Sequence, residues 1–231
     1  MSMATVLDAS RAKALALEAG FDLVGVIDPA HTHGPAWTRT VLVLGYATLD
    51  QAYDYNVYVE VRGLRRWSKL AYEVVVARAA RLALALRDHG ARAEPLVYED
   101  SAAIIDLRRA AVAAGLGVPG KNELVVSRDY GPRIRLGAVF TDLELAPDRP
   151  LSEYFCSSCT LCWTACPTRA LGPDGLDRSR CLAEFAPTPE MLARQKRELV
   201  QLTPFTRLQC VACVDSCPIG RGLAHPYWDG E

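Results

Sequence analysis

The spacing of the cysteines is the feature that most constrains this chain of 231 residues, because all eight lie between Cys156 and Cys217. The first run reads Cys156-x-x-Cys159-x-x-Cys162-x-x-x-Cys166-Pro167. This is the bacterial spacing for [4Fe–4S] ligation, in which the fourth thiolate leaves for a second cluster. The two-residue gaps let neighbouring thiolates converge on one cubane, and the proline after the last cysteine turns the chain away.

A second run repeats the pattern and predicts how the thiolates divide. Cys210-x-x-Cys213-x-x-x-Cys217-Pro218 matches the segment from Cys159 to Pro167 position for position, and it lacks only a counterpart of Cys156. Cys181 is the one cysteine left to supply that ligand. If the clusters exchange their fourth ligands, the first is held by Cys156, Cys159, Cys162 and Cys217, and the second by Cys166, Cys181, Cys210 and Cys213.

Zinc sites and disulfides are the alternatives for so many cysteines. Two four-cysteine zinc sites would also use eight thiolates, but zinc sites usually pair two C-x₂₋₄-C knuckles that lie far apart in sequence. Three close cysteines followed by a Cys-Pro pair, occurring nearly twice, are more typical of iron–sulfur clusters. We therefore predict clusters first, zinc second and disulfides last.

Composition sets the class of protein and the compartment. The hydrophobic share is 50% and the net charge is −1, which gives no global attraction to nucleic acid or to an anionic membrane. Residues 1–20 resemble an amphipathic helix and lack the basic start and apolar core of a secretory signal. No apolar run approaches the ~20 residues that span a bilayer. These observations predict a cytoplasmic protein with no membrane partner.

The residues before the cysteines alternate between predicted helices and strands. Tyr53, Tyr55 and Tyr58 fall in an irregular segment, 50–63, which could line a pocket or form an edge strand. Asp148-Arg149-Pro150 marks a linker. We expect helices over residues 8–19, 65–89, 101–114 and 190–202, and strands over residues 22–27, 40–47, 95–99, 123–127 and 134–141.

Two polar features of this part favour ordinary explanations. Arg62, Arg65, Arg66 and Lys69 cluster at the start of the predicted helix 65–89, where a solvated face is the usual reason and an anionic ligand is the alternative. The glycines from Gly115 to Gly120 follow a helix and precede a strand. Phosphate-binding loops have the opposite order, so a nicotinamide or nucleotide site is not expected.

Several segments together resemble the superfamily of epoxyqueuosine reductases and corrinoid-dependent reductive dehalogenases. They are the opening Gly20-Phe21-Asp22-Leu23-Val24-Gly25, the pair Asp100-Ser101, the stretch from Ala114 to Val126, the stretch from Tyr130 to Pro150, and the eight cysteines. The resemblance covers most of the chain. Many ferredoxins share the cysteine pattern, so the preceding segments carry the specificity.

This resemblance implies an α+β protein with two domains. Residues 1–150 would form a nitroreductase-like α/β domain that binds cobalamin, and residues 151–231 a ferredoxin-like domain with two [4Fe–4S] clusters. The clusters would take electrons from a low-potential donor such as ferredoxin or flavodoxin and pass them to the cobalamin, which reduces the substrate. Asp100 would be the proton donor, with local helix capping as its alternative role. The implied corrinoid contacts are Ser101, Gly120, Lys121, Asn122 and Tyr130.

The chain differs from these families in features that bear on the substrate. Epoxyqueuosine reductases continue into C-terminal helical repeats that help to hold tRNA, whereas this sequence ends 14 residues after Cys217. Together with the net charge of −1, this predicts a small-molecule or protein substrate rather than tRNA. The alternative function is a non-catalytic electron-transfer protein, or a reductive activator of another corrinoid protein.

Overall fold

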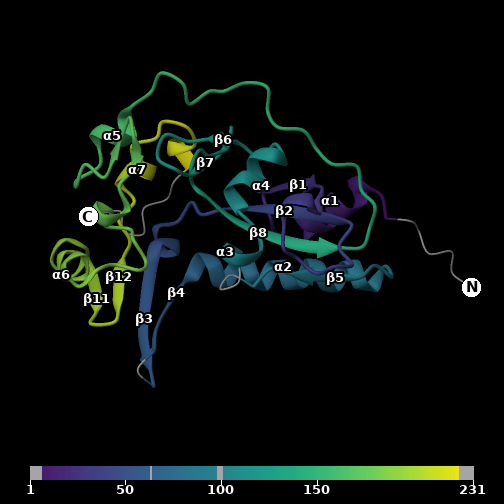
Figure 1. Ribbon diagram of the computed structural model, residues 1–231, viewed down its shortest axis with the longest axis horizontal. Helices are drawn as coiled ribbons and strands as arrows, with labels where there is room; N and C mark the ends of the chain where they lie inside the picture. Colours follow the sequence, from purple (N-terminus) through teal and green to yellow (C-terminus); the bar gives the residue numbers. More distant parts are fainter. Residues whose placement is uncertain (1–6, 63, 98–100, 224–231) are drawn as a thin grey trace, which may run out of the picture. The chain divides into compact units, whose positions relative to one another are not determined.

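The computed structural model describes residues 7–62, 64–97 and 101–223 (Figure 1), and the side chains within these ranges except those at 31, 59–61, 64–66 and 101. The chain divides into two compact units that interleave along the sequence. The first consists of Met1–Ala47, Val74–Pro119 and Ile134–Phe155. The second consists of Thr48–Glu73, Gly120–Arg133 and Cys156–Glu231. The predicted domain boundary at residue 150 lies within the last segment of the first unit.

An antiparallel sheet with the strand order β1-β2-β8-β5 forms the first unit. All eight residues of β2 are buried, which explains its continuous apolar run. Gly25 and Gly137 lie on opposite faces of the sheet, because Gly25 pairs with Val43 and Gly137 with the next residue along β2. The strands are β1 (Leu23–Ile27), β2 (Thr40–Ala47), β5 (Ala93–Pro95) and β8 (Ile134–Thr141).

Helices cover both faces of this sheet (Figure 1). A side chain at Gly25 would come within 2.5 Å of the Ala114 carbonyl at the end of α4, and one at Gly137 within 2.6 Å of Val75 in α2. Both glycines are therefore needed for close helix–sheet packing. The helices are α1 (Ala9–Glu18), α2 (Leu70–Asp88), α3 (Ser101–Ile104) and α4 (Leu107–Ala113).

A second antiparallel sheet, β11-β12-β3-β4, belongs to the other unit. Its strands are β3 (Tyr55–Val61), β4 (Leu64–Lys69), β11 (Gln201–Thr203) and β12 (Thr206–Leu208). A two-stranded ribbon of β9 (Leu171–Gly172) and β10 (Gly175–Leu176) accompanies it. The helices of this unit are α5 (Leu161–Thr164), α6 (Pro189–Glu198) and α7 (Ala212–Asp215), and α5 contacts α7.

Short elements complete the chain. They are the strands β6 (Val118–Pro119) and β7 (Val125–Val126) and the 3₁₀ turns η1 (Pro29–His31), η2 (Gln51–Asp54), η4 (Arg178–Arg180) and η5 (Arg221–Leu223). Among the residues described, no helix is both long enough and apolar enough to cross a membrane.

The structure confirms the strands at 22–27, 40–47 and 134–141 and the first helix, which Asp8 caps by accepting a hydrogen bond from Arg11 N at 2.8 Å. The helix predicted over 65–89 is wrong at its start, because residues up to Lys69 belong to β4 and α2 begins at Leu70. β3 pairs with both β12 and β4 and is an interior strand, so the edge strand, one of the two alternatives for residues 50–63, is wrong.

Three other predicted elements are shorter than expected. The helix over 101–114 is interrupted, because the Asp106 side chain accepts hydrogen bonds from Arg108 N and Arg109 N and starts a new helix there. The helix over 190–202 ends at Glu198, and its last residues form β11. The strand over 123–127 is reduced to β7.

Candidate iron–sulfur centre

The two cysteine runs adopt the same local conformation within one compact unit. Cys162 lies in α5 and Cys213 in α7, and the residues before these helices have nearly equal dihedral angles, φ −129° and ψ 15° at Thr160 and φ −121° and ψ 15° at Val211. Each helix ends in a turn that places the following Cys-Pro pair. The matched sequences thus give matched backbones, and each helix carries one thiol, Cys162 or Cys213.

The thiols of the first predicted cluster lie within electrostatic reach of one another. Burial raises the pKa of Cys162, and the charges of Cys156, Cys159 and Cys217 raise it further. Burial also raises the pKa of Cys217, which Cys156 and Cys159 raise as well. These four cysteines are the set that the exchange of the fourth ligand predicts.

The second set shows the same behaviour more strongly. Burial and the neighbouring thiolates, Cys210 and Cys181 foremost, raise the pKa of Cys213 to about 12. Burial raises the pKa of Cys181, as do the charges of Cys210 and Cys166. Cys162 of the first set also contributes to the raised pKa of Cys213, so the two sets are neighbours.

This donor set fits two iron–sulfur clusters. All eight cysteines are free thiols. A raised pKa keeps a cysteine protonated when no metal is bound, and iron ions that bind these sulfurs would displace the protons and supply the positive charge that stabilises neighbouring thiolates. Within the described ranges, no three His, Cys, Asp or Glu side chains are arranged to hold a single metal ion.

Cys166 is half-buried, and hydrogen bonds shift its pKa in the opposite direction to those of Cys162, Cys181 and Cys213. The backbone N of Ala170 donates to its Sγ at 3.2 Å, and Thr168 Oγ1 lies 3.6 Å away. Burial raises the pKa of Cys166, but the hydrogen bonds outweigh this effect and the pKa is lowered. Such hydrogen bonds to cluster sulfur are one of the means by which a protein sets a cluster's potential.

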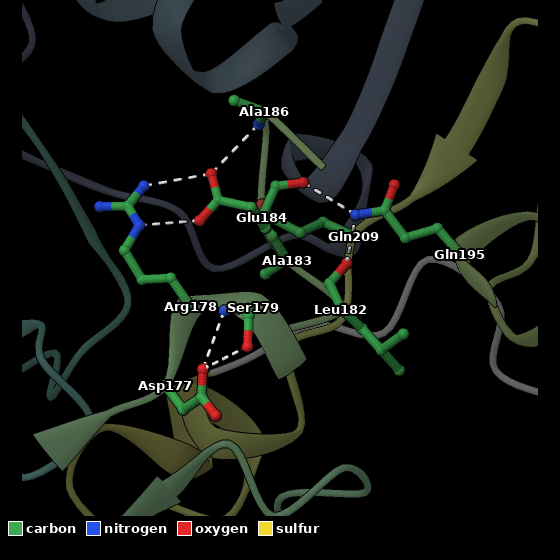
Figure 2. A network of polar contacts seen from close by, with 9 residues as sticks. All are labelled: Asp177, Arg178, Ser179, Leu182, Ala183, Glu184, Ala186, Gln195 and Gln209. Carbon is green, nitrogen blue, oxygen red and sulfur yellow. Dashed lines mark hydrogen bonds and ion pairs between the residues drawn. The ribbon is translucent and has the colours of Figure 1, made fainter. Parts of the chain in front are cut away.

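A polar network holds the segment that follows Cys181 (Figure 2). Arg178 makes a two-pronged ion pair with Glu184, with Nε at 2.8 Å and Nη2 at 3.1 Å from the carboxylate oxygens. Asp177 accepts hydrogen bonds from the backbone N and the hydroxyl of Ser179, at 3.0 and 2.6 Å. Residues 182–187, which follow Cys181, form neither helix nor strand, so side chains supply partners for part of their backbone.

Two of the predicted corrinoid contacts lie against the cysteine helices. The indole N of Trp163, which follows Cys162, donates to the carbonyl of Lys121 at 3.1 Å, and Lys121 Nζ lies 5.1 Å from the centre of the Trp163 ring. Asn122 is buried, and its Nδ2 donates to the carbonyl of Cys213 at 3.5 Å. The Gly-Lys-Asn segment thus supports both cysteine runs.

The remaining predicted site residues are placed as follows. Gly120 allows a tight turn, because a side chain there would come within 2.5 Å of Asn122 Oδ1. The backbone N of Tyr130 donates to Ser127 Oγ at 3.1 Å in a neighbouring turn. Ser101 begins α3 and belongs to the first unit, and its side chain is outside the described part of the chain. Asp100, the predicted proton donor, lies outside the described residues.

The predicted basic cluster does not survive as one surface feature. Lys69 is only 1% exposed and forms an ion pair with Asp54 at 3.0 Å, so neither a solvated face nor an anionic ligand explains it. Sequence reasoning missed this buried pair, together with Gln195, Arg207 and Gln209. No local signal in the sequence marks them, since their partners lie between 11 and 140 residues away along the chain.

Known proteins share both sequence and fold with this chain, although no protein-family model matches it. An epoxyqueuosine reductase of Lactococcus garvieae is 30% identical over 190 residues, which are 80% of this chain and 53% of that protein. One of Pseudomonas aeruginosa is 32% identical over 198 residues, 85% of this chain and 51% of that protein. A tetrachloroethene reductive dehalogenase of Desulfitobacterium hafniense is 36% identical over 114 residues, 46% of this chain and 21% of that protein.

Solved structures confirm the mixed α/β fold. A selenomethionine-labelled epoxyqueuosine reductase matches with a TM-score of 0.70 at 19% identity, covering 94% of this chain and 66% of that one. Another, solved with an epoxyqueuosine-modified tRNA stem loop, has a TM-score of 0.66 at 20% identity and coverages of 95% and 67%. A reductive dehalogenase has a TM-score of 0.57 at 18% identity and coverages of 84% and 35%.

The fold is therefore one that named reductases share. The chain is homologous to epoxyqueuosine reductases and reductive dehalogenases, which confirms the resemblance seen in the sequence. It spans about half the length of the curated epoxyqueuosine reductases it matches.

Proposed function

We propose that this protein is an iron–sulfur reductase in which two [4Fe–4S] clusters pass low-potential electrons to a bound cobalamin that reduces a substrate. The observation that carries the proposal is the presence of eight free cysteines in one compact unit, in two runs whose helices begin with nearly equal dihedral angles. Homologues named reductases support it, and so does the structural likeness to a reductive dehalogenase for which B12-dependent dehalogenation is described. The proposal includes a nitroreductase-like corrinoid domain and a ferredoxin-like cluster domain.

The electron-carrier alternative is less well supported. A carrier would need only the cysteine-rich segment, whereas the similarity to an epoxyqueuosine reductase extends over 80% of this chain. The named reductases among the homologues favour an enzyme for the same reason.

The residues of the chain have separable tasks in this proposal. The two thiol sets would hold the clusters, and both sets belong to one compact unit. When bound, cobalamin supplies a cobalt centre that can be reduced far enough to transfer electrons to the substrate. Asp100 remains the proposed proton donor, its carboxyl group giving a proton to the reduced substrate. Lys121 and Tyr130 remain proposed corrinoid contacts.

The prediction against tRNA is not borne out by the comparisons. One of the matching solved structures is an epoxyqueuosine reductase with a tRNA stem loop. The prediction relied on phosphate neutralisation, which dominates binding to duplexes. Proteins recognise RNA loops largely by stacking on unpaired bases and by hydrogen bonds to them, so a net charge of −1 does not exclude such a substrate.

Cobalamin binding tests the proposal directly. The iron-loaded protein, purified without oxygen, is mixed with cobalamin and its absorption spectrum is recorded. We expect the spectrum of a base-off corrinoid, unchanged in His89→Ala, because no histidine of the chain is expected to bind the cobalt. Absence of any spectral change at high micromolar cobalamin would overturn the proposal in favour of an electron carrier.

Turnover then decides between the substrate classes of the relatives. The cobalamin-loaded protein and a low-potential reductant are given either epoxyqueuosine-containing tRNA or tetrachloroethene. We expect multiple turnovers with one of them, and a loss of about 10²–10⁴-fold in rate in Asp100→Asn, as is typical for removal of a general acid. A rate unaffected by this change would exclude Asp100 as the proton donor.

A further inference from the structure

The segment that follows Cys181 is held by the side chains of two glutamines. Gln195 Nε2 donates to the carbonyl of Leu182 at 3.2 Å and to that of Glu184 at 2.8 Å (Figure 2). Gln209 Nε2 donates to the carbonyl between them, that of Ala183, at 3.3 Å. Three successive carbonyls of an irregular segment are thus satisfied by amide groups that come from α6 and from the residue before Cys210.

Each glutamine is itself oriented by a cation. Arg207 Nη1 donates to Gln195 Oε1 at 3.4 Å, and Lys69 Nζ donates to Gln209 Oε1. A lysine or arginine side chain offers only donors, so the amide oxygen must face it. The NH₂ group of each glutamine then points at the carbonyls after Cys181. We call the two cation–glutamine pairs, Lys69–Gln209 and Arg207–Gln195, relays, because each cation orients the glutamine amide that donates hydrogen bonds to the segment after Cys181.

Burial makes these relays rigid. Lys69 and Gln195 are each 1% exposed and Arg207 is 4% exposed. A buried cation is costly unless it is paired. Lys69 is paired with Asp54, and the guanidinium of Arg207 lies 3.8 Å from the centre of the Tyr58 ring. Neither cation can leave its position without the loss of a partner that compensates its burial.

The relay through Gln209 reaches two cysteines at once. Its side chain holds the segment after Cys181, and its backbone N donates to the carbonyl of Asp54 at 2.8 Å. The next residue is Cys210, so the same residue fixes the backbone that leads into a second ligand of the set. Asp54 also forms the ion pair with Lys69. The backbone of Gln209 and the side chain of Lys69 therefore both contact the residue that precedes β3.

We propose that Lys69 and Arg207 are positioning residues for the second cluster. Through Gln209 and Gln195 they keep the Cys181 segment in the conformation in which its thiol stays beside those of Cys210 and Cys213. The inference rests on the proposed function only in that it takes the second thiol set to hold a [4Fe–4S] cluster. It does not depend on cobalamin or on the substrate.

The test compares four variants that are purified and reconstituted with iron and sulfide without oxygen. Gln209→Leu and Gln195→Leu remove one relay each, Lys69→Met removes a cation, and Arg194→Gln is the matched control because Arg194 pairs with Glu198 on the exposed face of the same helix as Gln195. We expect about eight irons per chain in the wild type and in the control, and about four in the other three variants.

Spectroscopy separates positioning from general instability. After reduction, the electron paramagnetic resonance signal of the first cluster should persist in the relay variants, while that of the second is lost. Lys69→Arg, which keeps the charge, should restore part of the second signal. If Lys69→Met does not fold, Gln209→Leu decides the question, because it leaves the ion pair of Lys69 with Asp54 in place.

The outcomes distinguish this inference from the proposed function. About eight irons in every variant, with unchanged signals and reduction potentials of the second cluster, would overturn the positioning role while leaving the reductase proposal intact. A wild type that binds zinc, or no iron at all, would overturn the proposed function and this inference with it.

Discussion

Cys181 is the predicted ligand whose replacement would distinguish the two proposed clusters. It is the lone cysteine outside the repeated runs, and its raised pKa reflects burial and the charges of Cys210 and Cys166. Cys181→Ala should therefore remove the second cluster and leave the first, so that metal analysis falls from about eight to about four irons per chain. Ser158→Ala, an exposed change between two ligands, should keep both clusters. Retention of all the iron in Cys181→Ala would show that another residue supplies the ligand.

The ion pair between Arg178 and Glu184 makes a pH-dependent contribution to stability. Burial raises the pKa of Glu184, but the hydrogen bonds and charge of Arg178, with backbone N–H groups, outweigh it and lower the pKa. A carboxyl group with a lowered pKa stabilises the fold above its unfolded value of about 4.3, and this stabilisation is lost as the pH falls through the folded pKa.

Arg178→Gln should accordingly destabilise the protein at neutral pH by about 1 kcal/mol or less and have little effect well below pH 4. The measurement is the apparent unfolding midpoint of the iron-loaded protein as a function of pH, compared with Arg194→Gln. The Arg194 pair is 36% and 37% exposed, whereas Glu184 is 10% exposed, so the control should show the smaller change. Equal midpoints for the two variants at all pH values would contradict the prediction.

At the scale of elements, the backbone of the turn at Gly131 packs directly against the backbone of the segment after Cys217. Gly131 has φ 58°, and a side chain there would come within 2.1 Å of the carbonyl oxygen of Ile219. Gly220 has φ 70°, and a side chain there would come within 2.4 Å of the backbone of Tyr130. Arg133 Nη1 donates to the same Ile219 carbonyl at 3.1 Å. This contact fixes the segment that carries Cys217.

Gly131→Ala should displace that segment and weaken the first cluster. The expected cost is roughly 2–4 kcal/mol, because the change combines an unfavourable positive φ with a clash against rigid backbone. Iron analysis should show preferential loss of the first cluster, and the unfolding midpoint should fall. Gly172→Ala is the control, since no atom lies within 4 Å of a side chain added there. Equal behaviour of the two variants would contradict the fitted contact.

The sequence predicted those elements whose pattern is local. The apolar run of β2 and the capped helix α1 appear at nearly the predicted residues. The failure at residues 65–69 has a tertiary cause, because this stretch contains no helix breaker and its pairing with β3 depends on the hairpin. Lys69 also finds Gln209, 140 residues away, and such a partner cannot be seen from local spacing.

For the candidate site too, the sequence predicts the residues that follow a local pattern and misses those that depend on tertiary contacts. The repeated spacing predicts the two thiol sets, because cluster ligation depends on short local intervals, and this division of the ligands stays a prediction. The glutamines and buried cations that support the second set were invisible, because β3, β4 and β12 bring together residues from distant parts of the chain. Asn122 lay in a recognised segment, yet its hydrogen bond to the Cys213 carbonyl appears only in the structure.

At the scale of the whole molecule, we expect the two compact units to depend on metal to different degrees. The first has an apolar core around β2, in which Leu42, Leu44 and Val139 are fully buried. The second contains all eight cysteines, and its helices α5 and α7 have only four residues each. Such short helices are not stable by themselves and depend on tertiary contacts. Cluster binding should therefore be part of the folding energy of the second unit, but not of the first.

Removal of the iron should consequently unfold one unit and spare the other. The measurement is hydrogen exchange, followed by mass spectrometry, of the iron-loaded protein and of the same protein after treatment with a chelator under reducing conditions. We expect loss of protection in α5, α7 and the Cys181 segment, and retained protection in β1, β2 and β8, whose hydrogen bonds are enclosed in an apolar core. Cys181→Ala provides an intermediate state, in which loss should be confined to the surroundings of the second cluster. Uniform loss of protection in both units would show that they fold as one cooperative body, and unchanged protection in both would show that the clusters add nothing to the stability of either.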